Sequence, residues 1–391
     1  MVNCRALSSK AVGTRSAGFL NKSISGPVPF QNYPYTQQWN LALSHQFKGD
    51  MMAEASYTGL HGTNIPGLGS RNLNQIPDSF DSLGAALGNT PAPGACAAQD
   101  ASSAQNFTVG QCDRPFVYYN NVQDTAETYA REDYRSFQLR AEKRMGSAGE
   151  INANYTWSKN MGNTDTQNGF IESKSSQQGG NGAGAIQDWN NLGAEYSLIS
   201  YDVTNRVVVN YVVNLPFGKG QKYGNSFSDL GNALVSGWAL NGITTLQSGF
   251  PVFFATATQN QLTSLGAGTT RPNKVAGCNP VIGGSGLARA EAGGWFNTAC
   301  FTYPGDYAFG NEPRVDPQVR ADGVKNFDFS FQKSTPVREG TNFELRAEFF
   351  NIFNRVQFAP PVGTQGASNF GAVTYQVNKP RQIQLSARVN F

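Results

Sequence analysis

Apolar and polar residues alternate strictly along the last stretch of the chain. From Ile383 onward every second position is apolar, a set that comprises Ile383, Leu385, Ala387, Val389 and Phe391. The positions between them are polar and comprise Gln382, Gln384, Ser386, Arg388 and Asn390. Because a β-strand turns successive side chains to opposite faces, this pattern predicts a strand with one apolar and one polar face.

Eight further segments repeat this alternation. The nine predicted strands are Gln38–Phe47, Met51–Gly59, Ser136–Arg144, Ile151–Lys159, Arg206–Leu215, Trp238–Gln247, Asn326–Lys333, Asn342–Phe350 and Arg381–Phe391. Each is near the length of about 9–11 residues with which a tilted strand crosses hydrocarbon. No run of about 18 apolar residues predicts a transmembrane helix. The pattern therefore predicts an all-β fold, an antiparallel transmembrane β-barrel with an apolar outside and a polar lumen.

Short and long connections alternate between these segments. The short ones are Lys48–Asp50, Met145–Glu150 and Ser334–Thr341; the longer ones are His61–Arg135, Asn160–Asn205, Ser248–Lys325 and Asn351–Pro380, with Pro216–Gly237 intermediate. Outer-membrane barrels have short periplasmic turns and long extracellular loops, so Phe391 is expected at the periplasm. We expect an incomplete, open C-terminal segment of about nine strands, since closed barrels have an even number. Residues 34–391 form it, and residues 1–33 are an irregular N-terminal segment within an extracellular loop.

Composition agrees with this architecture. The chain has 391 residues with 15% charged, 12% aromatic and 43 glycines, which favours short strands joined by Gly-rich loops. A net charge of +3 gives no reason to expect a nucleic-acid partner. The start, Met1–Leu7, lacks the apolar core of a signal peptide, so we expect that it is not the natural beginning of a whole polypeptide.

Four of the five cysteines form two local pairs in long connections: Cys96 with Cys112, and Cys278 with Cys300. Such pairs predict two disulfides in an oxidising compartment, with free thiols as the main alternative. Cys4 is left over, without a predicted role. A metal site is disfavoured because no CxxC occurs and His45 and His61 lie far from both pairs in sequence. Nothing indicates a cofactor.

One charged group lies on the predicted polar face of Asn342–Phe350. Glu344, Arg346 and Glu348 are two residues apart on one strand face, so they can form an ion-pair ladder across neighbouring strands in the lumen. Such a ladder could also hold a plug or steer a polar solute. A catalytic carboxylate pair is disfavoured because no apolar pocket or assisting histidine accompanies it, and we predict no enzyme.

Aromatic residues mark two long connections and several strand ends. Tyr118 and Tyr119 lie beside two asparagines, and Trp295 and Phe296 precede another. Aromatic faces with amides suit sugars or peptides, but these residues can equally pack the loops, and both interpretations remain open. Aromatics near strand ends, such as Trp238, are typical of interfacial girdles.

Several motifs together resemble the C-terminal barrel of TonB-dependent outer-membrane receptors. They are Pro34–Asn40, Ala53–Gly59, Ala153–Lys159, Tyr201–Arg206, Leu215–Gly218, Arg346–Asn354 (Arg-Ala-Glu-Phe-Phe-Asn-Ile-Phe-Asn, the most specific) and Pro380–Gln384. The resemblance covers most of residues 30–391. It is closest to the Oar-like branch, whose complete members carry a carboxypeptidase-regulatory-like domain in front.

The resemblance implies a receptor or transporter for an unidentified extracellular solute in the outer membrane of a Gram-negative-type bacterium. The implied partners are outer-membrane lipid, the barrel-assembly machinery, for which Phe391 resembles the recognition signal, and the missing plug and N-terminal barrel portion. Complete receptors have about 22 strands and a plug, so energy-coupled import does not carry over to this chain alone. The alternatives are a self-contained adhesin or porin-like barrel and, third, a soluble secreted β-protein.

Overall fold

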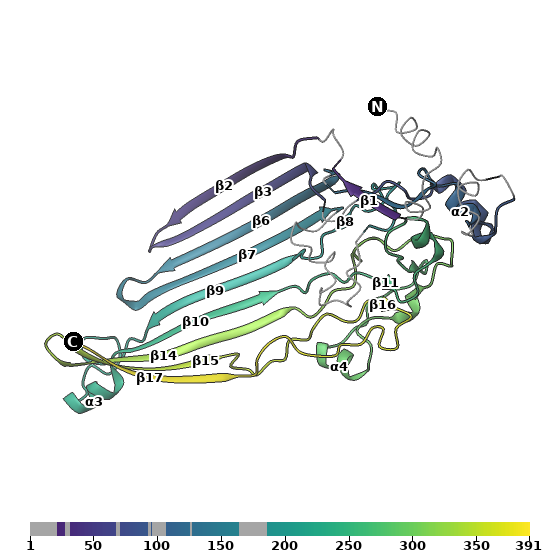
Figure 1. Ribbon diagram of the computed structural model, residues 1–391. Coiled ribbons are helices and arrows are strands. Elements are labelled where there is room, and N and C mark those ends of the chain that lie inside the picture. Colours follow the sequence, from purple (N-terminus) through teal and green to yellow (C-terminus); the bar gives the residue numbers. More distant parts are fainter. Residues whose placement is uncertain are drawn as a thin grey trace.

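The computed structural model describes residues 22–27, 32–67, 71–92, 95, 107–125, 127–163 and 186–391, which form one large antiparallel sheet with a layer of loops at one end (Figure 1). Its strands are β2 (Tyr35–Phe47), β3 (Met51–Ile65), β6 (Ala130–Arg144), β7 (Gly149–Gly162), β9 (Asn205–Asn214), β10 (Trp238–Gln247), β14 (Val324–Arg338), β15 (Thr341–Phe350) and β17 (Gln382–Asn390). They pair in sequence order, and the short β8 (Ser197–Leu198) adds to β7. All nine predicted strands are therefore confirmed.

Several strands extend beyond their predicted ends. β14 continues to Arg338, so the predicted turn Ser334–Thr341 shrinks to Glu339 and Gly340. β3 and β6 pair past the apolar stretch, where His61 Nδ1 lies 2.6 Å from Asp133 Oδ1 across the two strands. Backbone pairing between the two strands thus continues beyond the residues in which apolar and polar side chains alternate.

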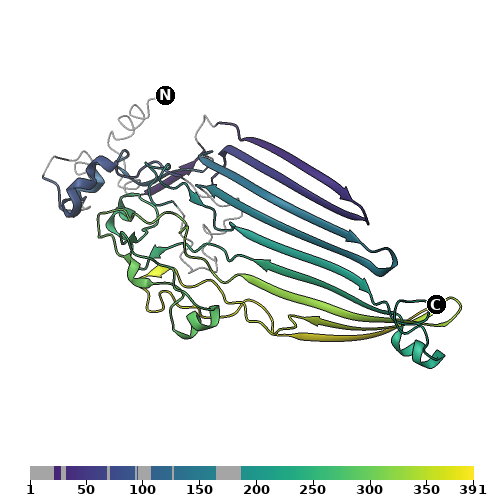
Figure 2. The same ribbon diagram turned by 180° about the vertical axis from the view of Figure 1, so that it is seen from behind.

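The sheet is open, as predicted. Its edge strands are β2 and β17, and within the described part of the chain neither has a partner on its outer side (Figures 1 and 2). Because every neighbouring pair on the path from β17 to β2 is antiparallel and the path holds nine strands, the two edges run in the same direction. They therefore cannot close the sheet by antiparallel pairing with each other.

The two faces of the sheet differ as the alternation predicts. Register places Ala347 beside Leu385 on one face and Glu348 beside Gln384 on the other. The first face carries exposed apolar side chains across its width, among them Leu43, Leu139, Ile151, Phe331, Leu345 and Leu385. An exposed apolar face of this extent indicates contact with another apolar phase.

The long connections and residues 22–27 fold together into a compact unit, which we call the loop layer and which comprises the described parts of 22–27, 66–129, 163–204, 248–323 and 351–381. It holds β1 (Lys22–Gly26), which pairs with β5 (Tyr119–Asp124), together with β4 (Arg71–Asn72), β11 (Ala255–Thr256), β12 (Asn273–Lys274), β13 (Phe301–Thr302), β16 (Thr364–Gln365), η1 (Asp78–Gly88), α2 (Val109–Cys112), η4 (Gln261–Leu265), α4 (Gly286–Glu291) and η5 (Thr298–Cys300). Segment 1–33, expected to be irregular, thus contains one strand.

Two apolar clusters hold the loop layer together. Phe254 lies at the centre of one, stacked on Phe301 with ring centroids 4.1 Å apart. In the other, Ile76 and Leu87 of the first long connection pack with Leu262 and Leu265 of the third. The opposite end of the sheet, the short-turn end, carries η3 (Gly146–Ala148) and α3 (Asp229–Val235). No helix in the described residues combines the length and apolar character of a membrane span.

Candidate functional site

The polar face of the sheet carries a charged ladder on β15. Arg346 lies between two carboxylates, with its guanidinium 2.9 Å from Glu344 Oε1 and 3.7 Å from Glu348 Oε1. It also donates to Gln332 Oε1 on β14 over 3.4 Å. The predicted residues are thus brought together and are half-buried. Their ion pairs run along β15 itself, however, and not across neighbouring strands as expected. This arrangement can present alternating charge to a polar solute or to a protein segment beside it.

A second charged group lies across β6 and β7, and sequence reasoning did not single it out. Glu142 accepts from Arg140 over 3.1 Å and from Arg144 over 2.7 Å, and Arg144 is 3.9 Å from Glu150. Register places Glu142 beside Asn152, so these charges share the polar face. The signal for finding them was present, since Arg140, Glu142 and Arg144 alternate as Glu344, Arg346 and Glu348 do.

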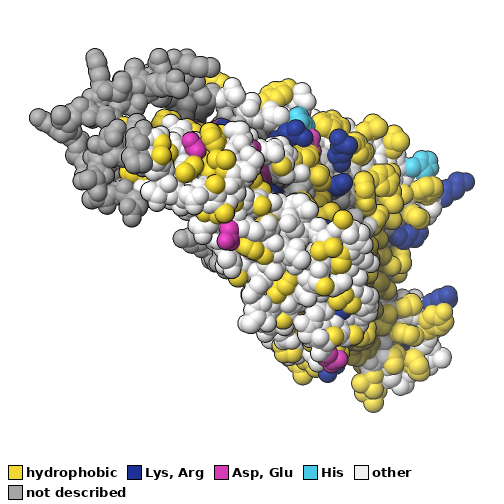
Figure 3. All heavy atoms as spheres, turned by 90° about the vertical axis from the view of Figure 1, so that its right-hand side faces the viewer, with side chains coloured by type: hydrophobic (Ala, Val, Ile, Leu, Met, Phe, Trp, Pro, Cys, Tyr) yellow, Lys and Arg dark blue, Asp and Glu magenta, His cyan; other side chains and the backbone are white. Residues whose placement is uncertain are grey.

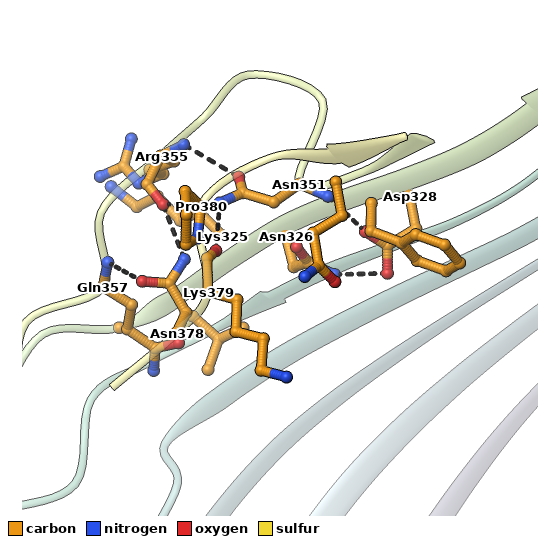
Figure 4. Close-up of a pocket in the computed structure, with 13 residues that line it drawn as sticks. Lys325, Asn326, Asp328, Asn351, Arg355, Gln357, Asn378, Lys379 and Pro380 are labelled. Atoms are coloured by element: carbon orange, nitrogen blue, oxygen red, sulfur yellow. Dashed lines mark hydrogen bonds between the residues drawn. The ribbon is translucent and has the colours of Figure 1, made fainter. Parts of the chain in front are cut away.

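A polar cavity of about 320 Å³ lies where β14, β15 and β17 meet the loop layer (Figure 4). Asp328 forms part of its wall, accepting from Asn326 Nδ2 over 2.7 Å and from the Asn351 backbone nitrogen over 2.8 Å. The Asn351 side chain donates to the carbonyls of Arg355 (2.9 Å) and Lys379 (3.1 Å). Its φ of 49° is a left-handed conformation that asparagine tolerates. Asn351, which belongs to the Arg346–Asn354 motif, thus joins the start of the last long connection to its end.

Buried ion pairs stiffen the loop layer above this face. The Arg271 guanidinium contacts both oxygens of Glu195 at 2.5 and 3.2 Å, and both side chains are buried. Arg314 donates to the carbonyls of Glu195 and Leu198, each over 3.2 Å. Figure 3, which looks at the loop-bearing end, accordingly shows few charged side chains on the described surface of the layer.

One buried carboxyl in the loop layer is neutral at ordinary pH. Glu312 is 1% exposed, and burial, followed by the charge of nearby Asp316, raises its pKa to about 9. Asp316 itself is held by Lys274 Nζ at 2.6 Å and by two backbone nitrogens, those of Gln318 and Val319. The sequence offered no signal for this group.

The predicted disulfide between Cys278 and Cys300 is present, with the two Cα atoms 5.5 Å apart. Cys112 is also disulfide-bonded, while Cys96 and Cys4 lie outside the described residues. Phe391 is 99% exposed at the short-turn end.

The aromatic loop residues have two different settings. Trp295 and Phe296 are each 1% exposed within the Phe254 cluster, so packing is the interpretation that the structure supports for them, and neither side chain is open to a ligand. Tyr118 packs half-buried against Phe107, and Tyr119 begins β5. No group of three acidic, histidine or cysteine side chains in the described residues could hold a metal ion.

The sequence model of one protein family, described as an outer membrane beta barrel domain, matches residues 6–384. Among solved structures, the outer membrane transporter YddB from Escherichia coli is similar over 96% of this chain and 35% of that one, with 9% identity and a TM-score of 0.44. The ferripyoverdine receptor of Pseudomonas aeruginosa, bound to ferripyoverdine, is similar over 91% and 27% (7% identity, TM-score 0.36). The ferric citrate transporter FecA, unliganded, is similar over 91% and 31% (10% identity, TM-score 0.35). The chain thus spans about a third of these proteins' length. No curated protein matches it.

Proposed function

Because the chain belongs to the outer membrane beta barrel domain family and resides in the bacterial outer membrane, we propose that it supplies part of the barrel of a TonB-dependent receptor of the Oar-like branch. In this proposal the receptor takes up or binds an extracellular solute. The observation that carries it is the two-sidedness of the open sheet. The apolar face meets lipid, and the charged groups around Arg346 and Glu142 face the lumen beneath a stiff loop layer.

Further strands and a plug are the partners that such a barrel requires. The unpaired edges of β2 and β17 would leave backbone groups unsatisfied in hydrocarbon, at a cost of several kcal/mol each. Added strands would remove that cost. The ladder at Arg346 presents both positive and negative side chains with which a plug domain could form ion pairs. Phe391, exposed at the short-turn end, remains the proposed signal for the assembly machinery.

The proposal includes no enzymatic step. The carboxylates of the polar face form ion pairs with arginines, as Glu344 and Glu142 do, and the proposal gives them only this structural role.

Transport assays in cells test this function. Accumulation of a panel of labelled iron chelates, oligosaccharides and peptides is compared between the parent strain and a strain lacking the gene, with and without a protonophore. We expect one solute whose accumulation needs both the gene and the proton gradient. Accumulation that needs the gene but is unaffected by the protonophore would favour the porin-like alternative. Loss of surface attachment with unchanged accumulation would favour the adhesin.

A further inference from the structure

The connection between β9 and β10 differs from the other turns at the short-turn end because it contains a helix with exposed leucines. Leu230 and Leu234 of α3 are 75% and 64% exposed, and Phe227 just before the helix is 45% exposed. Residues four apart on a helix lie on the same side, so the two leucines form one apolar surface. Tyr223 and Phe217 of the same connection are also exposed.

This connection is held in a defined shape. The Ser228 hydroxyl caps the helix by accepting from the Gly231 nitrogen over 3.2 Å. Asn232 Oδ1 accepts from the Lys219 nitrogen over 2.6 Å, and Lys219 Nζ lies 2.5 Å from Asp229 Oδ1. These hydrogen bonds and this ion pair hold the helix in place with its leucines exposed. Fraying of the helix therefore does not explain why the leucines are exposed.

The C-terminal end of the helix is hydrogen-bonded to two side chains on the apolar side of the sheet at its rim. Trp238 Nε1 donates to the Leu234 carbonyl over 3.0 Å, and Lys333 Nζ donates to the Ser236 carbonyl over 2.6 Å. Trp238 and Lys333 are paired in register, next to the pair formed two residues on by Leu240 and Phe331 of the apolar face. Lys333 Nζ also sits 5.4 Å from the Trp238 ring centroid. A tryptophan and a lysine at the end of an apolar band mark a membrane–water interface.

We propose that α3 is an interfacial anchor that inserts Phe227, Leu230 and Leu234 into the periplasmic leaflet of the outer membrane. Three observations together specify lipid as the occupant of this surface. Leu234 is hydrogen-bonded through its carbonyl to Trp238, Trp238 borders the lipid-facing band, and the turn end of an outer-membrane barrel faces the periplasm. Figures 1 and 2 place α3 at the short-turn end of the sheet, past the ends of β9 and β10 and far from α4.

Such an anchor fixes how deeply the sheet sits in the bilayer. Each aromatic side chain of an interfacial girdle resists displacement of its own strand along the membrane normal. A helix bonded to Trp238 and Lys333 adds an apolar surface parallel to the leaflet, which resists tilting of the neighbouring strands as well.

Lipid photolabelling of the full-length chain in outer membranes tests the proposal. A phosphatidylcholine with a diazirine near the glycerol end of one acyl chain is incorporated, irradiated and mapped by mass spectrometry. We expect adducts on residues 227–234 as well as on strand residues such as Leu345. Adducts on Leu345 without any on residues 227–234 would overturn the proposal, and this comparison requires no variant.

Two variants sharpen the test. L230D/L234D should lower labelling of α3 by about tenfold, because carboxylates are strongly disfavoured among acyl chains. The matched control is L287D, which alters an exposed leucine on α4 in the loop layer and should leave α3 labelling unchanged. A photoreactive amino acid at Leu230 that captures a periplasmic protein or a second copy in place of phospholipid would also overturn the proposal.

Discussion

The backbone nitrogen of Asn351 donates a hydrogen bond to Oδ1 of Asp328 over 2.8 Å, which fixes the end of β15 against β14. The Asn351 side chain then reaches Arg355 and Lys379, at the two ends of the last long connection. One residue of the Arg346–Asn354 motif thereby sets how three strands enter the loop layer.

Replacing Asn351 by alanine should destabilise this corner by about 2–4 kcal/mol, since it removes three side-chain hydrogen bonds and strains a residue at positive φ. Asn351→Gly is the matched control, because it loses the same bonds without the strain and should cost less. Denaturant titration of the complete proposed receptor that carries each substitution measures both. Equal stability of Asn351→Ala and the parent would contradict the assigned role.

The register predicts opposite outcomes for neighbouring substitutions in β17. Leu385→Arg places a charge on the lipid-facing side beside Ala347, at a cost of about 2–4 kcal/mol near the bilayer midplane. Gln384→Arg places it on the polar face beside Glu348 and should be tolerated. The amount of each variant folded in the outer membrane of cells that produce the complete proposed receptor compares the two, and equal amounts would invalidate the assignment of faces.

Glu312 should make the loop layer less stable as pH rises. Its pKa of about 9 in the folded protein exceeds the ordinary 4.5, so the folded state retains a proton that the unfolded state releases. The stabilisation is full below pH 4.5 and is lost as pH rises through about 9. Glu312→Gln should therefore match the parent at pH 4 and exceed its protease resistance at pH 9. The control is Glu291→Gln, on exposed α4, which should follow the parent at both pH values.

Non-reducing peptide mapping of protein from the cell surface should recover Cys278 joined to Cys300 and Cys96 joined to Cys112. The first bridge closes a segment with a sequence separation of 22 and should stabilise it by about 3 kcal/mol in the chain-entropy model. Alkylation of all five thiols without prior reduction would exclude both bridges.

The chain produced alone should aggregate or fail to insert into vesicles, because its two edges run in the same direction and remain unpaired. Electrophoresis with and without heating provides the measurement. A monomeric, heat-modifiable barrel formed by residues 1–391 would contradict this expectation and favour a self-contained barrel.

Period-two patterning predicted the sheet because each strand face meets a uniform environment, as Ile383–Phe391 illustrates. It could not predict pairing beyond the apolar band, where His61 meets Asp133. Within the Gly-rich connections no periodicity separates buried aromatics such as Trp295 from exposed ones. The Glu195–Arg271 pair joins residues 76 apart, so its partners are identified only once the loops are folded. The residues of the ladder at Arg346 were predictable because they alternate within one strand, whereas their pairing along β15, instead of across neighbouring strands, was not.

The four long connections share backbone hydrogen bonds as well as apolar cores. The Ile76 nitrogen donates to the Leu265 carbonyl, Gly268 to Gln187, and Trp295 to Gly371. A chimera that exchanges the third connection, residues 248–323, with that of a relative would therefore break contacts to the other three. We therefore expect that this layer can be transplanted between relatives only as a complete set of connections.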